Sequence, residues 1–168
     1  LNGILDTKLG ICYTMPLLYV AVAQRLGYPI YPVAAPDHLF ARYVDPSFKQ
    51  QNIETTSGGK YFPDEDYFKD FSVSKKGLKS GSYLRTMTYK EFVAHILWSS
   101  TFAFRKKDGH KTLAYMEMAV EIDPRFADFH YSLGEGYLAK SNVVNGNQAA
   151  ALRDKAKWHV SKARQLGY

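Results

Sequence analysis

The chain has 168 residues, 46% of them hydrophobic and 15% aromatic, a composition that excludes general disorder and fits one domain or two small ones. Its single cysteine excludes an internal disulfide and any zinc site built from several cysteines. The formal net charge is +6, but the basic residues form short, scattered clusters, whereas a nucleic-acid binder gathers them on one face. We therefore expect a solvated surface rather than a polyanion site.

Because the chain begins with Leu1 rather than Met, we expect it to be a fragment that lacks its native N-terminus. A targeting segment that had been removed would leave no trace, so the sequence does not distinguish a cytoplasmic from a periplasmic location. No apolar run is long enough to cross a bilayer, and we expect no transmembrane segment.

The first apolar segment predicts a buried helix, because hydrophobic side chains occupy nearly every face of it up to Leu26. Gly27 and Pro29 end this helix. Pro16 is tolerated only in a first helical turn, so we expect the helix to begin around residues 12–13. This start would place Cys12 at the helix N-terminus.

Extended segments follow the predicted helix. Residues 30–35 and 39–44 predict two strands, and residues 52–56 a third, short one. Pro32 indicates that the first strand lies at an edge or carries a bulge. A helix followed by antiparallel strands predicts an α+β fold rather than alternating α/β units.

The rest of the chain differs in composition and in predicted secondary structure. Residues 61–87 predict a polar connector rich in Lys, Ser, Gly and Asp. Residues 88–168 predict helices only, over 89–105, 109–121, 126–140 and 148–166. An apolar stripe on the first of these indicates a core face that includes Phe92, Phe102 and Phe104.

This helical part resembles the tetratricopeptide repeat, a helical hairpin with a 34-residue period. The positions that match its packing residues are Ala119, Leu133, Gly134, Tyr137 and Ala163. About ten extra residues between Lys140 and Ala156 depart from the period. We interpret the region as two degenerate repeats that bind a protein partner.

Cys12 has two interpretations. Most free cysteines are small buried hydrophobic residues. At a helix N-terminus, however, the partial positive charge of the helix favours the thiolate, which is the nucleophilic form.

A general base and an orienting acid lie further along. His38 opens the second strand and can meet Cys12 if the helix packs on the sheet, although a lone histidine is usually a surface or core residue. Asp45 lies seven residues further along the same strand, roughly 23 Å away at a strand's rise per residue. Glu54 lies on the strand that returns beside it, so the geometry favours Glu54.

Gly10-Ile11-Cys12 before an apolar helix, His38 at a strand start, and residues 52–56 together resemble the bacterial transglutaminase-like superfamily. The resemblance covers about residues 1–60 and implies a papain-like α+β core with a catalytic triad. It implies that Cys12 is the nucleophile, that His38 is the base, and that Glu54 stands where the family usually has Asp. No oxyanion-stabilising side chain before Cys12 matches the family.

The resemblance implies acyl transfer or hydrolysis on a peptide or protein amide through an acyl-enzyme, without a cofactor or a metal. Water as acceptor gives hydrolysis or deamidation, and an amine gives crosslinking. Two rival hypotheses remain: a non-catalytic interaction module that uses the helical repeats, and a weaker one, a polyanion binder.

Other motifs carry no chemistry. Residues 134–139 read G-x-G-x-x-A, but no strand precedes them, so they predict packing glycines within a helix. The run of residues 57–60 has no earlier glycine at the spacing of a phosphate loop. The remaining histidines lack metal-ligand spacing and are interpreted as surface or packing residues: His95, His110, His130 and His159.

Overall fold

The computed structural model describes residues 2–168 and, within them, every side chain except those of residues 2 and 104. The chain divides into two compact units. The N-terminal unit consists of the residues up to Val73 together with Tyr83–Phe92. The C-terminal unit consists of Ser74–Ser82 and Val93–Tyr168. The sequence predicts a core up to residue 60, a connector up to residue 87 and a helical region after it. The two units have other limits, because the chain passes between them three times.

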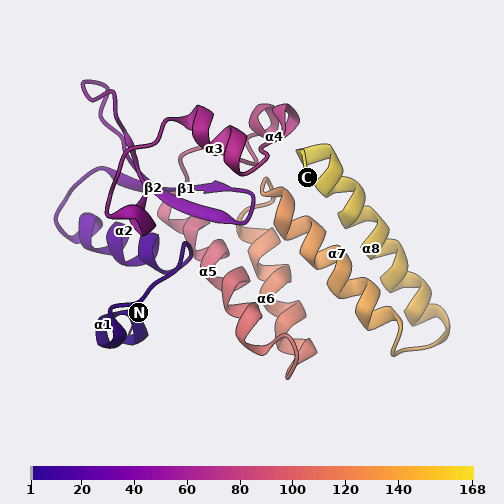
Figure 1. Cartoon of the computed structure of the whole chain (residues 1–168). Coiled ribbons are helices and arrows are strands. Elements are labelled where there is room, and N and C mark those ends of the chain that lie inside the picture. Colours follow the sequence, from indigo (N-terminus) through magenta and orange to yellow (C-terminus); the bar gives the residue numbers. More distant parts are fainter. Residues whose placement is uncertain (1) are drawn as a thin grey trace. The chain divides into compact units, whose positions relative to one another are not determined.

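The N-terminal unit contains a three-stranded antiparallel sheet, and its fold is α+β as predicted (Figure 1). The strands are β1 (Ile30–Ala35), β2 (His38–Tyr43) and β3 (Asn52–Ile53), in that spatial order. The β1–β2 register runs from Ile30 opposite Tyr43 to Ala35 opposite His38. A two-residue turn therefore joins the strands and places His38 at the start of β2.

β1 is the edge strand of this sheet, as Pro32 predicts. The carbonyl of Pro32 accepts a hydrogen bond from the Met87 N–H at 2.9 Å, and the carbonyl of Ala34 accepts one from the Leu84 N–H at 2.8 Å. Proline has no N–H to donate, but an edge strand can still use its carbonyls. Residues 84–87 thus extend the sheet beyond β1.

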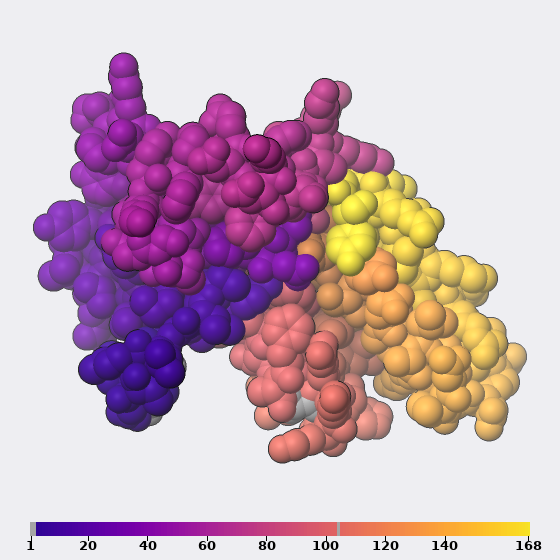
Figure 2. Space-filling model, viewed as in Figure 1, coloured from indigo at the N-terminus to yellow at the C-terminus, as the bar shows by residue number. Residues whose placement is uncertain are grey.

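The helix after Cys12 begins later than predicted. It is α2 (Met15–Arg25), it packs on β1 and β2, and Pro16 is its second residue. The N–H groups of Thr14 and Met15 both donate to the Ile11 carbonyl at 2.9 Å, so a separate turn precedes the helix. Cys12 lies in this turn rather than in the helix itself. The preceding helix, α1 (Asn2–Thr7), forms a separate lobe, indigo in Figure 2.

The third strand is shorter than predicted, because the chain turns into the 3₁₀ helix η1 (Thr55–Ser57) directly after Glu54. The predicted connector is not a plain linker. It contains α3 (Asp64–Asp70) in the N-terminal unit and α4 (Lys75–Ser80) in the C-terminal unit.

The C-terminal unit is helical, as predicted. Its longer helices are α5 (Tyr89–Phe104), whose first turn belongs to the N-terminal unit, α6 (Gly109–Ile122), α7 (Ala127–Ser141) and α8 (Gly146–Leu166). The side chains at its core belong to Leu113, Leu133, Tyr137, Leu152 and Ala156. The extra residues before Ala156 mostly lengthen α8, which has 21 residues.

The predicted packing positions on these helices can be compared with the structure. Gly134 lies inside α7, where a Cβ would come within 2.8 Å of the Val160 side chain, so its place is a close helix contact and not a nucleotide loop. On α5 Phe92 is buried, but Phe102 is 45% exposed, which the predicted core stripe does not account for. The side chain of Phe104 lies outside the described residues. Among residues 2–168, no helix combines the length and the apolarity that a membrane span requires.

Candidate active site

Cys12 lies in the turn that leads into α2, and local contacts shape this turn. The Ile11 N–H donates to Thr14 Oγ1 at 2.9 Å, closing the turn around the cysteine. A Cβ on Gly10 would come within 2.3 Å of the Met15 sulfur, so a larger residue there would require the flexible Met15 side chain to move. The half-buried Cys12 thiol lies 3.8 Å from the carbonyl oxygen of Asp37, the residue before His38, and it helps to raise the pKa of the His38 side chain.

His38 is the first residue of β2, and only 8% of it is exposed. Its Nε2 lies 2.7 Å from Oε2 of Glu54. The structure thus brings the three residues of this row, Cys12, His38 and Glu54, near one another, with His38 and Glu54 in direct contact.

The position of Glu54 follows from the β2–β3 register. Ala41 lies opposite Ile53, so the next residue, Glu54, comes alongside Phe40, and His38 is the diagonal neighbour on the same face. Asp45, the rejected alternative, instead accepts hydrogen bonds from Ser47 in an exposed turn.

The charges of this row are coupled. Burial alone would lower the pKa of His38, but its hydrogen bonds with Cys12 and Glu54, and their negative charges, outweigh burial and raise it to about 9. Burial alone would raise the pKa of Glu54, but hydrogen bonds from His38 and Thr56 lower it to about 2. At neutral pH the site thus holds an imidazolium bound to a carboxylate.

Three residues that surround this pair are not among those predicted from the sequence. Thr56 donates to Glu54 Oε1 from its backbone N–H at 3.0 Å and from its hydroxyl. Tyr67 donates its hydroxyl to Oε2 at 3.1 Å. Phe71 stacks on the His38 ring with a centroid distance of 4.3 Å. The four-residue spacing of the two aromatic residues on a short acidic helix was the available signal.

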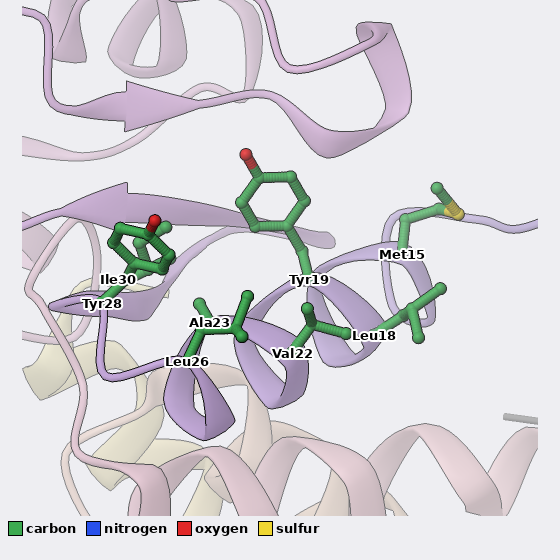
Figure 3. A pocket seen from close by; sticks show the side chains of 8 residues that line it. All are labelled: Met15, Leu18, Tyr19, Val22, Ala23, Leu26, Tyr28 and Ile30. Atoms are coloured by element: carbon green, nitrogen blue, oxygen red, sulfur yellow. The ribbon is translucent and has the colours of Figure 1, made fainter.

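Beside the pair is a cavity of about 210 Å³, lined by His38 and Glu54 together with Asp66 and Asp70 of α3 and the three aromatic residues Phe62, Tyr67 and Phe71. A larger apolar groove of about 520 Å³ follows α2 from Met15 and continues past its end to Tyr28 and Ile30 (Figure 3). Its lining contains no nucleophile or base. Within the described part of the chain, no three His, Cys, Asp or Glu side chains gather in a way that could hold a metal ion.

A family model described as the Transglutaminase-like superfamily matches residues 1–97. The match includes the turn of Cys12, the sheet with His38 and Glu54, and α3. No curated protein and no solved structure matches the chain.

Proposed function

Since the chain belongs to the transglutaminase-like superfamily, we propose that it performs thiol-dependent acyl transfer or hydrolysis on a peptide or protein amide. In this proposal Cys12 is the nucleophile, His38 is the general acid and base, and Glu54 orients and charges the imidazole. The observation that carries it is the buried His38 ring, whose Nε2 contacts a carboxylate and whose pKa the only thiol of the chain helps to raise.

The proposed reaction has two steps. The Cys12 thiolate attacks the amide carbonyl carbon, the C–N bond breaks, and imidazolium His38 gives its proton to the leaving amine, which leaves a thioester. Neutral His38 then takes a proton from water or from an amine as that acceptor attacks the thioester, the C–S bond breaks, and the Cys12 thiolate is released beside imidazolium His38. The Glu54 carboxylate at Nε2 favours the charged ring with which the first step begins and the second step ends.

The first test is the reactivity of the thiol. Because Cys12 is the only cysteine, iodoacetamide labelling of the full chain at pH 6 reports on it alone. We expect fast labelling in the unaltered protein and labelling at least about tenfold slower in His38→Ala. The reason is that a neighbouring opposite charge favours an ionised group, here the thiolate, by about 1–3 pK units. His110→Ala, an exposed histidine of α6, is the matched control.

The second test is the acyl-enzyme. With p-nitrophenyl acetate we expect a burst of one nitrophenol per chain, and an intact mass increased by one acetyl group, which Cys12→Ser abolishes. Equal labelling of the His38→Ala and unaltered proteins, together with no burst, would reject catalysis.

A second function, protein binding by the C-terminal unit, is favoured by the α7–α8 groove. This groove of about 500 Å³ includes Leu138 and Val160, and it is lined by three exposed cationic side chains of α8: Arg153, Lys157 and Arg164. Its charge suits an acidic segment with apolar side chains, and it supports the predicted partner site on the helical repeats.

The groove can be tested with a fluorescent acidic amphipathic peptide and its Gln-substituted version. We expect only the acidic peptide to bind, and Lys157→Glu to weaken it several-fold more than Lys155→Glu, which changes the same charge outside the groove. Equal weakening would indicate a general charge effect and no defined site.

A further inference from the structure

The Glu54 carboxylate uses both of its oxygens. Oε1 accepts two hydrogen bonds from Thr56, one residue into η1. Oε2 accepts from His38 Nε2 at 2.7 Å and from the Tyr67 hydroxyl at 3.1 Å. A carboxylate held at both ends cannot turn without breaking several bonds at once. The orientation of the imidazole therefore depends on groups that lie outside the row of three.

Tyr67 is well placed to hold Oε2. The side chain is 3% exposed, and its ring stacks on Phe40, the residue opposite Glu54, with a centroid distance of 3.9 Å. Burial first, and then the Glu54 charge, raise the pKa of Tyr67, so the hydroxyl keeps its proton and acts as a donor at neutral pH.

α3 is itself anchored to the sheet. Its first residue, Asp64, accepts hydrogen bonds from Arg42 of β2 at 2.6 Å and from Asn52 of β3 at 2.7 Å. These bonds fix the start of the helix on the two strands that carry His38 and lead to Glu54. Tyr67 follows one turn later, and Phe71, the C-cap residue directly after the helix, one turn after that, so this segment reaches both members of the pair.

We propose that Tyr67 is a positioning residue, whose hydroxyl holds Glu54 Oε2 in line with His38 Nε2 and thereby presents the other ring nitrogen to Cys12. The value of this positioning to the protein rests on the proposed function. The orientation of the His38 ring can be measured without it. It makes α3 part of the active site, although the sequence of α3 carries no residue of the row.

Removing the Tyr67 hydroxyl changes the bond between Glu54 and His38 in opposite directions for two possible roles of Tyr67. If Tyr67 only shares Oε2 with His38, its loss leaves more negative charge for His38, and the remaining hydrogen bond becomes stronger. If Tyr67 positions the carboxylate, its loss frees Glu54 to turn, and the bond to His38 becomes weaker and more open to water. The sign of the change therefore separates competition from positioning.

Several ionisable groups surround His38 and can influence its pKa. Glu54 contacts it directly, Cys12 raises its pKa, Asp66 and Asp70 line the same cavity, and Arg42 and Asp64 lie beyond Tyr67. Tyr67→Phe leaves all of them in place and keeps the ring that packs on Phe40.

The experiment compares Tyr67→Phe with Tyr137→Phe in the full chain. Tyr137 donates its hydroxyl to Glu117 Oε1 at 2.7 Å in the C-terminal unit, so the control removes the same kind of bond outside the unit that holds the site. Two quantities are measured: the water-exchange rate of the His38 Nε2 proton by NMR, and the iodoacetamide rate of Cys12 at pH 6.

For Tyr67→Phe we expect the Nε2 proton to exchange about three- to tenfold faster and Cys12 to react about three- to tenfold more slowly, the factor that one hydrogen bond accounts for. Tyr137→Phe should change neither. Unchanged values, or a better protected proton with faster labelling, would overturn the positioning role.

The NMR readout keeps this inference separate from the proposed function. Faster proton exchange in Tyr67→Phe, with no acyl-enzyme in the unaltered protein, would support the positioning role and reject catalysis. An acyl-enzyme in the unaltered protein, with unchanged exchange in Tyr67→Phe, would do the reverse.

Discussion

Glu54 has two tasks that a shorter acid could not perform together. Its Oε1 accepts from the Thr56 N–H and so caps η1, while its Oε2 reaches His38 on the neighbouring strand. Asp is itself a good cap for a residue two positions on, because its short side chain reaches that N–H easily. The extra methylene of Glu is what allows the second contact.

We therefore expect Glu54→Asp to keep the η1 cap but lose the bond to His38. Labelling of Cys12 at pH 6 should slow by about tenfold or more, the range for a hydrogen bond to a charged group. Glu54→Gln keeps the length and loses the charge, and it should slow labelling as well. A Glu54→Asp protein that labels at the original rate would show that the length of the side chain is irrelevant.

The ionisation of the pair predicts how stability depends on pH. The pKa of His38 is raised from 6.5 to about 9, so its contribution is complete below pH 6.5 and is lost as the pH rises to 9. The pKa of Glu54 is lowered from 4.5 to about 2, so its contribution is present above pH 4.5 and is lost as the pH falls to 2.

The free energy of unfolding from urea titrations should therefore fall on both sides of the range between these limits. In the double variant His38→Gln/Glu54→Gln, the decline between pH 6.5 and 9 should be smaller. An identical decline in both proteins would mean that other groups cause it.

At the scale of the elements, α7 and α8 approach each other closely at one glycine. A Cβ on Gly134 would lie 2.8 Å from Val160 Cγ2 and 3.1 Å from the Ala156 carbonyl oxygen. Valine is stiff about χ1 and the carbonyl belongs to the helix backbone, so neither neighbour can move cheaply. This contact explains a glycine in the interior of a helix, where glycine is otherwise unfavourable.

Gly134→Ala should accordingly lower the stability of the C-terminal unit by about 1–3 kcal/mol, the usual cost of overpacking, despite the better helix propensity of alanine. Gly109→Ala, at the start of α6, is the matched control, because a Cβ at that position would meet no neighbouring atom within 4 Å. Thermal unfolding of the two variants measures the difference. Equal melting temperatures would contradict a tight α7–α8 contact.

At the scale of the whole molecule, the two units are interleaved along the chain. α4 lies between two segments of the N-terminal unit in sequence but belongs to the C-terminal unit. Ser74 donates its hydroxyl to the Gly167 carbonyl and Ser80 donates to the Leu166 carbonyl, both at 2.6 Å. These carbonyls are at the end of α8, where no helical N–H follows to bind them.

Ser80→Ala should destabilise the last turn of α8 by about 1 kcal/mol, which is the usual net contribution of one hydrogen bond. Ser74→Ala should cost more, because Ser74 also caps α4 by accepting from the Gly77 N–H at 2.9 Å. Amide hydrogen exchange of α8 measures both effects. Cys12 labelling should stay unchanged, since these residues lie in the other unit, and a parallel loss would show that the units depend on each other.

Most of the longer helices, two of the strands and the pairing of His38 with Glu54 could be predicted from the sequence. Hydrophobic periodicity and Gly or Pro boundaries are local signals, and they sufficed for the long helices, for β1 and β2, and for the placement of His38 at a strand start. Glu54 could be chosen over Asp45 because strand rise and a single returning hairpin set the distances. The start of α2 was wrong by a few residues, because the Ile11 carbonyl closes its own turn first.

The groups that surround those side chains could not be predicted from the sequence, because tertiary contacts bring them there. Tyr67 and Phe71 reach the pair because Arg42 and Asn52 bind Asp64 across more than ten residues of sequence, a contact that no local pattern encodes. The place of α4 beside the end of α8 likewise depends on bonds between residues 74–80 and 166–167. Periodicity indicates which face of an element is apolar, but packing selects the element that covers it.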